Sequence, residues 1–256
     1  MKKFLAIVLA AMMLLVCFAG CGKKQETGVA NLTDNTVDNV YNGFAYETNE
    51  DGDYTIIGYV LETTKDSVLT IPTTINERPV TSIGDGAFKA NLAKKINIPE
   101  GIVTIGMTAF FDCDNLTDVK LPSTVTSVGE AAFANCDKLV RCTLSANMTE
   151  ISDYMFRNCT ALTYFTMTEK ITSIGAGAFM GCTSLKRIAD IPAGLTSIGD
   201  CAFIGCVMDY INLPASLTTI GEYILSLKSN TQINAPADSA ILTYARENGY
   251  KVNVVK

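Results

Sequence analysis

Hydrophobic and polar positions repeat along most of this chain with a period of about 23 residues. Each copy contains an apolar–polar–apolar triplet before proline, an extended segment ending in glycine, and an Ala-Phe pair followed by cysteine, as in Ile96 to Pro99, Ile102 to Gly106 and Ala109 to Cys113. The triplet predicts a short strand with its apolar side chains inward. Proline ends this strand because it has no N–H to donate to a neighbouring coil.

One aromatic position advances by 22, 23, 23, 23 and 24 residues, through Phe88, Phe110, Phe133, Phe156, Phe179 and Phe203. In a solenoid each repeat stacks on the next, so equivalent residues of successive repeats form a column. We expect the extended segment to form a second short strand, the glycine to supply a permissive corner, and Ala-Phe-x-x-Cys to make a single helical turn. The fourth repeat has Ser145, Ser152 and Met155 in place of proline, glycine and alanine, which predicts a local irregularity.

These motifs closely resemble the BspA-like leucine-rich repeats of bacterial surface proteins, over about residues 55–256. The resemblance implies an α/β-type solenoid, a right-handed coil of about seven repeats over 68–227, with a short parallel strand and a short helical turn in each. It also implies an N-terminal hairpin cap over 41–67, turning at Asp51-Gly52, and a C-terminal cap over 228–256 with a helix near 239–248 and then a strand.

The N-terminus has the features of an export signal. Lys2 and Lys3 precede an apolar run that is short for a membrane span, and Ala19-Gly20-Cys21 resembles a bacterial lipobox. We expect residues 1–21 to be a lipoprotein-type signal peptide, Cys21 to carry the lipid, and polar residues 22–40 to form a flexible tether. Ordinary cleavage that releases a secreted protein is the alternative.

The amino-acid composition argues against several classes of catalytic and binding function. The chain contains no histidine, which removes the commonest general base and metal ligand, and its net charge of −6 argues against nucleic acid and anionic lipid as partners. No Gly-rich phosphate loop is present, and we expect no cofactor and no metal. The acidic segment 49–53 has some features of a calcium loop, but lacks the spaced ligands of an EF-hand and is interpreted as a hairpin turn.

Five of the nine cysteines fall at one repeat position, and we expect them to form a buried structural ladder: Cys113, Cys136, Cys159, Cys182 and Cys206. Cys142 stands at an inward strand position, and Cys201 at the position of Gly86 near a corner. A disulfide between adjacent coils or a metal site is the alternative, although ligands spread along one column suit a tetrahedral site poorly.

One exposed column is the candidate binding site. The residue immediately before each apolar–polar–apolar triplet should face solvent. These residues are Lys95, Asp118, Arg141, Tyr164, Arg187 and Tyr210. Arginine and tyrosine are favoured at binding surfaces, so we take Arg141, Tyr164, Arg187 and Tyr210 as the ligand-facing residues. The simpler alternative is that tyrosine merely suits exposed strands.

The expected function is a non-catalytic binding module, anchored by its N-terminal lipid at the outer face of the bacterial membrane or at the cell surface. The family resemblance implies adhesion or macromolecule recognition, with a protein or glycan on a host or neighbouring cell as partner. We expect a monomer that contacts the membrane only through its lipid. A scaffold or spacer that binds another envelope protein of the same cell is the alternative.

Overall fold

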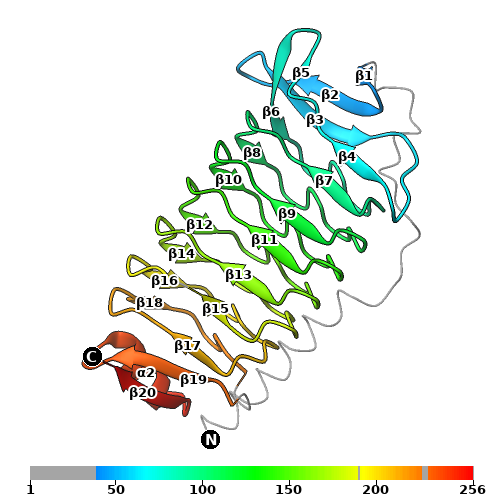
Figure 1. The fold of residues 1–256 in the computed structure, drawn as a ribbon. Coiled ribbons are helices and arrows are strands. Elements are labelled where there is room, and N and C mark those ends of the chain that lie inside the picture. Colours follow the sequence, from blue (N-terminus) through cyan, green and yellow to red (C-terminus); the bar gives the residue numbers. More distant parts are fainter. Residues whose placement is uncertain (1–38, 190, 227–229, 256) are drawn as a thin grey trace, which may run out of the picture.

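The computed structural model describes residues 39–189, 191–226 and 230–255. They form an elongated coil of about nine turns, with a hairpin at the N-terminal end and one helix at the C-terminal end (Figure 1). The solenoid predicted from the 23-residue period is confirmed. The coil continues beyond the seven repeats counted in the sequence.

The first wall of the coil, called here the strand face, contains the apolar–polar–apolar triplets. Its strands lie in succession along one side of the coil (Figure 1). Along a strand the residues alternate outward, inward and outward, as do Arg141, Cys142 and Thr143. Its strands are β4 (Val68–Thr70), β7 (Lys95–Asn97), β9 (Asp118–Lys120), β11 (Arg141–Thr143), β13 (Tyr164–Thr166), β15 (Ile188–Ala189), β17 (Tyr210–Asn212), β19 (Gln232–Pro236) and β20 (Lys251–Val255). The ladders are parallel, and they run over β4–β7, over β9–β11–β13–β15 and over β17–β19–β20.

The second wall contains the short extended segments that precede glycine. Its strands are β3 (Tyr54–Tyr59), β6 (Arg78–Ile83), β8 (Thr104–Ile105), β10 (Ser127–Val128), β12 (Glu150–Ile151), β14 (Ser173–Ile174), β16 (Ser197–Ile198) and β18 (Thr219–Ile220). Parallel ladders join β3 through β10 and β12 through β18, so this wall is divided between β10 and β12. The division falls at the fourth repeat, where the sequence predicts an irregularity.

The third wall, called the turn wall, holds the Ala-Phe-x-x-Cys segments, and here the expected helical turn is wrong. Each segment is a series of tight turns in which successive N–H groups alternate in direction. The N–H of Phe110 donates to Ala132 of the next coil, whereas that of Phe111 donates back to Thr108. Thr108 has a φ of 51°, outside the range of a right-handed helix. The coil is therefore a β-type solenoid with almost no helix.

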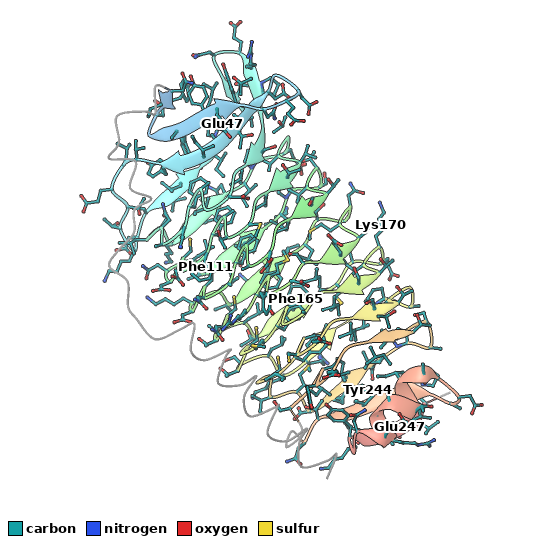
Figure 2. The ribbon with its side chains drawn as sticks, turned by 180° about the vertical axis from the view of Figure 1, so that it is seen from behind. Glu47, Phe111, Phe165, Lys170, Tyr244 and Glu247 are labelled. Atoms are coloured by element: carbon teal, nitrogen blue, oxygen red, sulfur yellow. The ribbon has the colours of Figure 1, made fainter. Side chains whose placement is uncertain are left out.

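The interior is filled by columns of identical residues. Neighbouring phenylalanine rings are nearly parallel, with centroids 5.0 Å apart for Phe110 and Phe133 and 5.9 Å apart for Phe133 and Phe156. Phe165 joins this stack from the strand face, edge-on to Phe156 and Phe179 (Figure 2). Each ring is fully buried, so every coil depends on its two neighbours for its core.

The repeated corner glycines are needed for close approach rather than for an unusual φ, contrary to the sequence interpretation. A Cβ added to Gly129 would lie 2.5 Å from the backbone nitrogen of Met107. In the fourth repeat Ser152 takes this position, and its hydroxyl donates to the carbonyl of Gly129. Its Cβ cannot fit at glycine distance, which explains why the ladder stops between β10 and β12.

The two ends of the coil carry the remaining elements. At the N-terminal end β1 (Val40–Tyr41), β2 (Phe44–Thr48) and β3 form an antiparallel sheet, and β5 (Thr74–Ile75) pairs with β6. At the C-terminal end α2 (Ala240–Glu247) begins at the N-cap Ser239 and packs on β19 and β20. Over the described ranges, no helix has the length and apolar character needed to cross a membrane.

Candidate functional site

The structure aligns the predicted binding residues in one column along the strand face. Strand pairing places Asp118 beside Arg141 and Arg141 beside Tyr164, and the pairing of the next residues, Phe165 and Ile188, brings Arg187 to the following position. Tyr210 begins β17, one coil further, where the ladder from β15 is interrupted. The column continues at its C-terminal end through Gln232 and Lys251. We call this row, from Lys95 to Lys251, the first column.

A second column, which the sequence interpretation missed, runs parallel to the first, two residues further along each strand. It is rich in amide and hydroxyl groups, and the Asn97 amide donates to the Thr70 hydroxyl at 2.9 Å. At the C-terminal end the Asn234 amide donates to Asn212 at 2.8 Å. Its members are Asn97, Lys120, Thr143, Thr166, Ala189, Asn212, Asn234 and Asn253. Its polar residues recur in the sequence with the same period as the first column, so the pattern could have been recognised there.

Arg141 makes a specific contact within the first column. Its Nε donates to the Oδ2 of Asp118 at 2.9 Å, and both side chains remain largely accessible, at 66% and 40% exposure. Lys95, Lys120 and Arg187 form no ion pair with the acidic residues that the structure describes. Pairs this exposed contribute little to stability, so the contact mainly orients the guanidinium.

Charge is distributed unequally between the walls. The two columns of the strand face contain five cationic side chains, Lys95, Lys120, Arg141, Arg187 and Lys251, and one acidic side chain, Asp118. Five acidic residues instead follow the corner position of the second wall, which is glycine in four of these repeats and Ser152 in the fifth. They form a corner column made of Asp85, Glu130, Asp153, Asp200 and Glu222. The chain has a net charge of −6, yet its strand face is basic.

The corner column has a structural function that explains its acidity. The carboxylates of Asp85, Asp153 and Asp200 each accept a hydrogen bond of 2.7 Å from the backbone N–H one coil further on. These carboxylates cap N–H groups that the turn leaves without another partner. These three aspartates therefore contribute to the coil itself, whereas the cations of the strand face are available for a ligand.

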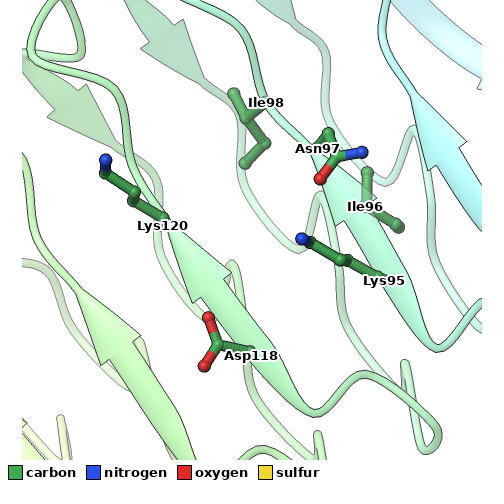
Figure 3. Close-up of a pocket in the computed structure, with 6 residues that line it drawn as sticks. All are labelled: Lys95, Ile96, Asn97, Ile98, Asp118 and Lys120. Carbon is green, nitrogen blue, oxygen red and sulfur yellow. The ribbon is translucent and has the colours of Figure 1, made fainter.

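A hollow of about 240 Å³ lies on the strand face between β7 and β9 (Figure 3), where the parallel ladder is interrupted. It is lined by Lys95, Ile96, Asn97, Ile98, Asp118 and Lys120. Two ammonium groups, one amide and one carboxylate suit the binding of a polar ligand. The side chains in this lining carry no thiol or hydroxyl group.

The cysteines of the predicted ladder lie in the interior. All five are buried, and each thiol donates to the carbonyl of a phenylalanine in the preceding coils, as Cys136 does to Phe110 at 3.2 Å. Burial raises the pKa of these thiols, to about 12 for Cys206. Cys142 is also buried, facing inward from β11. A buried neutral thiol is a poor nucleophile, so these cysteines serve the core.

Cys201 differs from the ladder. It is partly exposed and has a φ of 58°, close to the 61° of Gly86 at the same repeat position, as the sequence alignment of repeats implied.

The segment with features of a calcium loop is a hairpin turn between β2 and β3, because the Asn49 side chain accepts hydrogen bonds from the N–H groups of Asp51 and Asp53. Among the residues that the structure describes, no group of three or more Cys, Asp or Glu side chains is placed to hold a metal ion. The predicted lipid site, Cys21, lies outside those residues.

Comparison with known proteins gives the following relationships. The family model described as BspA type leucine-rich repeat region matches six copies, over residues 81–206 and 189–250. Among solved structures, a leucine-rich cell surface protein from Faecalibacterium prausnitzii is 29% identical with a TM-score of 0.68, and the match covers 79% of this chain and 55% of that one. This chain therefore spans about half of that protein. No curated protein matches the chain.

Two further solved structures resemble the coil. The leucine-rich repeat protein of T. pallidum is 22% identical with a TM-score of 0.63, covering 84% of this chain and 97% of that one. A leucine-rich repeat protein from Bacteroides ovatus is 21% identical with a TM-score of 0.54, covering 84% and 67%. At these identities the likeness concerns the fold alone.

Proposed function

Because the chain belongs to the BspA-type leucine-rich repeat family, a family of cell surface repeat proteins, we propose that it is a surface-displayed, lipid-anchored binding module. It recognises a macromolecule through the strand face, in adhesion or a related form of recognition. Solenoids bind through extended surfaces rather than enclosed pockets, and the strand face extends along the whole coil (Figure 1).

The basic character of the strand face is the observation that carries this proposal. Cations without an acidic partner in the described structure, such as Lys95 and Arg187, lie on the wall where side chains vary between repeats. Tyr210 adds an exposed aromatic ring to the same column. Arginine and tyrosine offer large contact areas and directional hydrogen bonds, which makes them common at the centres of interfaces.

Anchoring at the surface is supported by the N-terminal sequence and by one relative. The apolar leader followed by Ala19-Gly20-Cys21 suits lipidation at Cys21, and the F. prausnitzii protein is described as a cell surface protein. Cys21→Ala should move the protein from the membrane fraction to the medium or periplasm. Mass spectrometry of the mature N-terminus that found an unmodified peptide beginning elsewhere would contradict lipid anchoring.

A scaffold role in the cell's own envelope is the second candidate, because the same face could hold a neighbouring protein. A pull-down with the purified protein, from host mucosal and matrix extracts and in parallel from the bacterial envelope, separates the two roles by the identity of the captured partner. Both roles are non-catalytic, which agrees with a histidine-free sequence.

Substitution of the first column tests whether capture uses the strand face. The variant with alanine at Arg141, Tyr164, Arg187 and Tyr210 should lose capture of the partner. A matched variant with alanine at Ser127, Glu150, Thr218 and Thr219, all exposed on the second wall, should retain it. Unchanged capture by the first variant would refute the strand face as the binding surface.

A further inference from the structure

We propose, building on the proposed function, that the ligand of the strand face is an acidic polysaccharide that carries a carboxylate on every second sugar. The charge distribution is the first reason. A basic face attracts a polyanion, whereas the acidic corner column of the second wall repels it. The difference favours the strand face over the second wall as the site of binding.

The spacing of the cations is the second reason. In the first column Arg141 and Arg187 are separated by two coils of one ladder, which is about 10 Å at the usual strand spacing. Lys95 lies two coils before Arg141, across the interruption between β7 and β9. A pyranose unit in an extended chain advances by about one strand spacing. Cations on alternate coils therefore match carboxylates on alternate sugars.

The residues between the cations are the third reason. Asp118, Tyr164 and Tyr210 occupy the alternate coils, so no cation faces the intervening sugars from the first column. Asp118 would repel a carboxylate at its coil but would accept hydrogen bonds from the hydroxyls of a neutral sugar. Tyr210, 36% exposed, presents a ring that can pack against the apolar face of a sugar.

The second column favours a glycan over an acidic peptide. Asn97, Thr143 and Asn212 provide amide and hydroxyl groups in the row next to the cations, and such groups pair with the many hydroxyls of sugars. An acidic peptide would use the cations but would leave this row of donors and acceptors without partners. The hollow between β7 and β9 has Asp118 in its lining beside Lys95, Lys120 and Asn97, so it would receive the neutral sugar next to the uronate that Lys95 binds (Figure 3).

The test measures binding of the purified protein to defined polymers by calorimetry at low and high salt. Hyaluronan, in which a uronate alternates with a neutral amino sugar, is the probe, and polygalacturonate, dextran, polyglutamate and single-stranded DNA are the comparisons. We expect hyaluronan to bind most tightly, with an affinity that falls as salt rises. Equal binding of polyglutamate or DNA would show unselective anion binding, and dextran binding as tightly as hyaluronan would show that charge has no part; either result would overturn the inference.

Variants locate the site. Lys95→Gln with Arg187→Gln should weaken hyaluronan binding by about tenfold for each charge-assisted hydrogen bond that the substitutions remove. The matched control, Lys138→Gln with Lys170→Gln, removes the same charge outside both columns and should leave the affinity unchanged. Asp118→Asn should increase the affinity for polygalacturonate relative to hyaluronan, because it removes the charge that rejects a carboxylate at that coil. Equal weakening in the double variant and its control would overturn the inference.

These results are distinguishable from a failure of the proposed function. If hyaluronan does not bind, but the alanine variant of the first column still loses capture of a partner from extracts, the polysaccharide inference fails and the binding module stands. If the alanine variant captures its partner normally, the proposed function fails whatever the polymers do.

Discussion

The turn wall and the strand face are made by the same repeat, yet they differ in how strictly they fix residue identity. On the turn wall, Phe and Cys recur in almost every coil because each side chain is enclosed between identical neighbours. On the strand face, Lys95, Asp118, Arg141 and Tyr164 succeed one another at a single position. The backbone ladders supply the stacking there and leave outward side chains free to vary. The side of the coil that fixes its stability thus differs from the side that we propose for recognition.

The largest expected effect is the loss of stability at alkaline pH, which ionises thiols that the folded coil buries. An unfolded thiol ionises near pH 8.5, whereas burial keeps the pKa of the folded thiols well higher, about 12 for Cys206. Stability is therefore complete below pH 8.5 and falls as pH rises toward the folded pKa, by about 1.4 kcal/mol per pH unit for each buried thiol. Urea unfolding between pH 7.5 and 10 under reducing conditions should show a steep loss.

Single substitutions identify the thiols responsible for this pH dependence. Cys136→Ala removes one buried thiol and should make the loss with pH less steep, whereas Cys201→Ser, at a partly exposed position, should leave its slope nearly unchanged. A free energy of unfolding that stayed constant between pH 8 and 10 would contradict the burial of the cysteine ladder.

Removal of one stacked ring is the next largest effect. Phe133→Ala should lower the free energy of unfolding by about 3–5 kcal/mol, because the ring is fully buried between Phe110 and Phe156. Phe111→Ala, on the same wall but only partly buried, is the control and should cost less than half as much. Chemical denaturation measures both. Equal effects would mean that the stacked column is not the core of the coil.

The close approach of the coils can be tested with one methyl group. Gly129→Ala should destabilise the protein by about 1–3 kcal/mol, because its Cβ would meet the backbone of Met107 and Gly106. At Gly194 a Cβ meets nothing within 4 Å, so Gly194→Ala should change stability by less than about 1 kcal/mol. Thermal unfolding of the pair distinguishes crowding from a general effect of losing glycine; matching shifts in Tm would refute the crowding.

The smallest expected effect concerns a ladder of amides on the turn wall. The Asn135 side chain donates to Asp112 at 2.8 Å and accepts from Asn158 at 3.0 Å, and its φ is 60°. Asn135→Ala should cost about 1–2 kcal/mol, through the missing hydrogen bonds and a left-handed backbone that alanine disfavours. Asn135→Gly relieves the backbone and should cost about half as much. If glycine were as costly as alanine, the backbone would have no part in the effect.

Sequence periodicity was sufficient to predict the solenoid, its inward columns and the register of the first column. These features depend on which side chains are buried between coils, and burial restricts the amino acid found at each repeat position. The tight turns could not be predicted in the same way, because Ala-Phe-x-x-Cys spacing also fits one helical turn. Thr108 and Tyr154 adopt left-handed φ values without belonging to a residue type that favours them.

Two features, one on the turn wall and one in the candidate site, were present in the sequence but emerged only from the structure. Asp112, Asn135 and Asn158 are spaced by one repeat and belong to types that tolerate left-handed φ, so the amide ladder had a signal. The basic strand face was hidden by the net charge of −6, because a sum over the chain does not show which wall holds each charge. Assigning the acids to backbone caps required their hydrogen bonds, which no spacing reveals.

The interrupted ladder between β10 and β12 has a mechanical consequence. A pull along the coil axis loads the contacts between successive coils in series, so separation begins at a junction where a ladder is interrupted. Ser152 places one such junction on the second wall, near the middle of the array, and the strand face is interrupted nearer the two ends, after β7 and after β15. Under shear, we expect the coil to part at these junctions and extend in steps, each segment keeping its own stack of rings while the chain between the segments absorbs the strain.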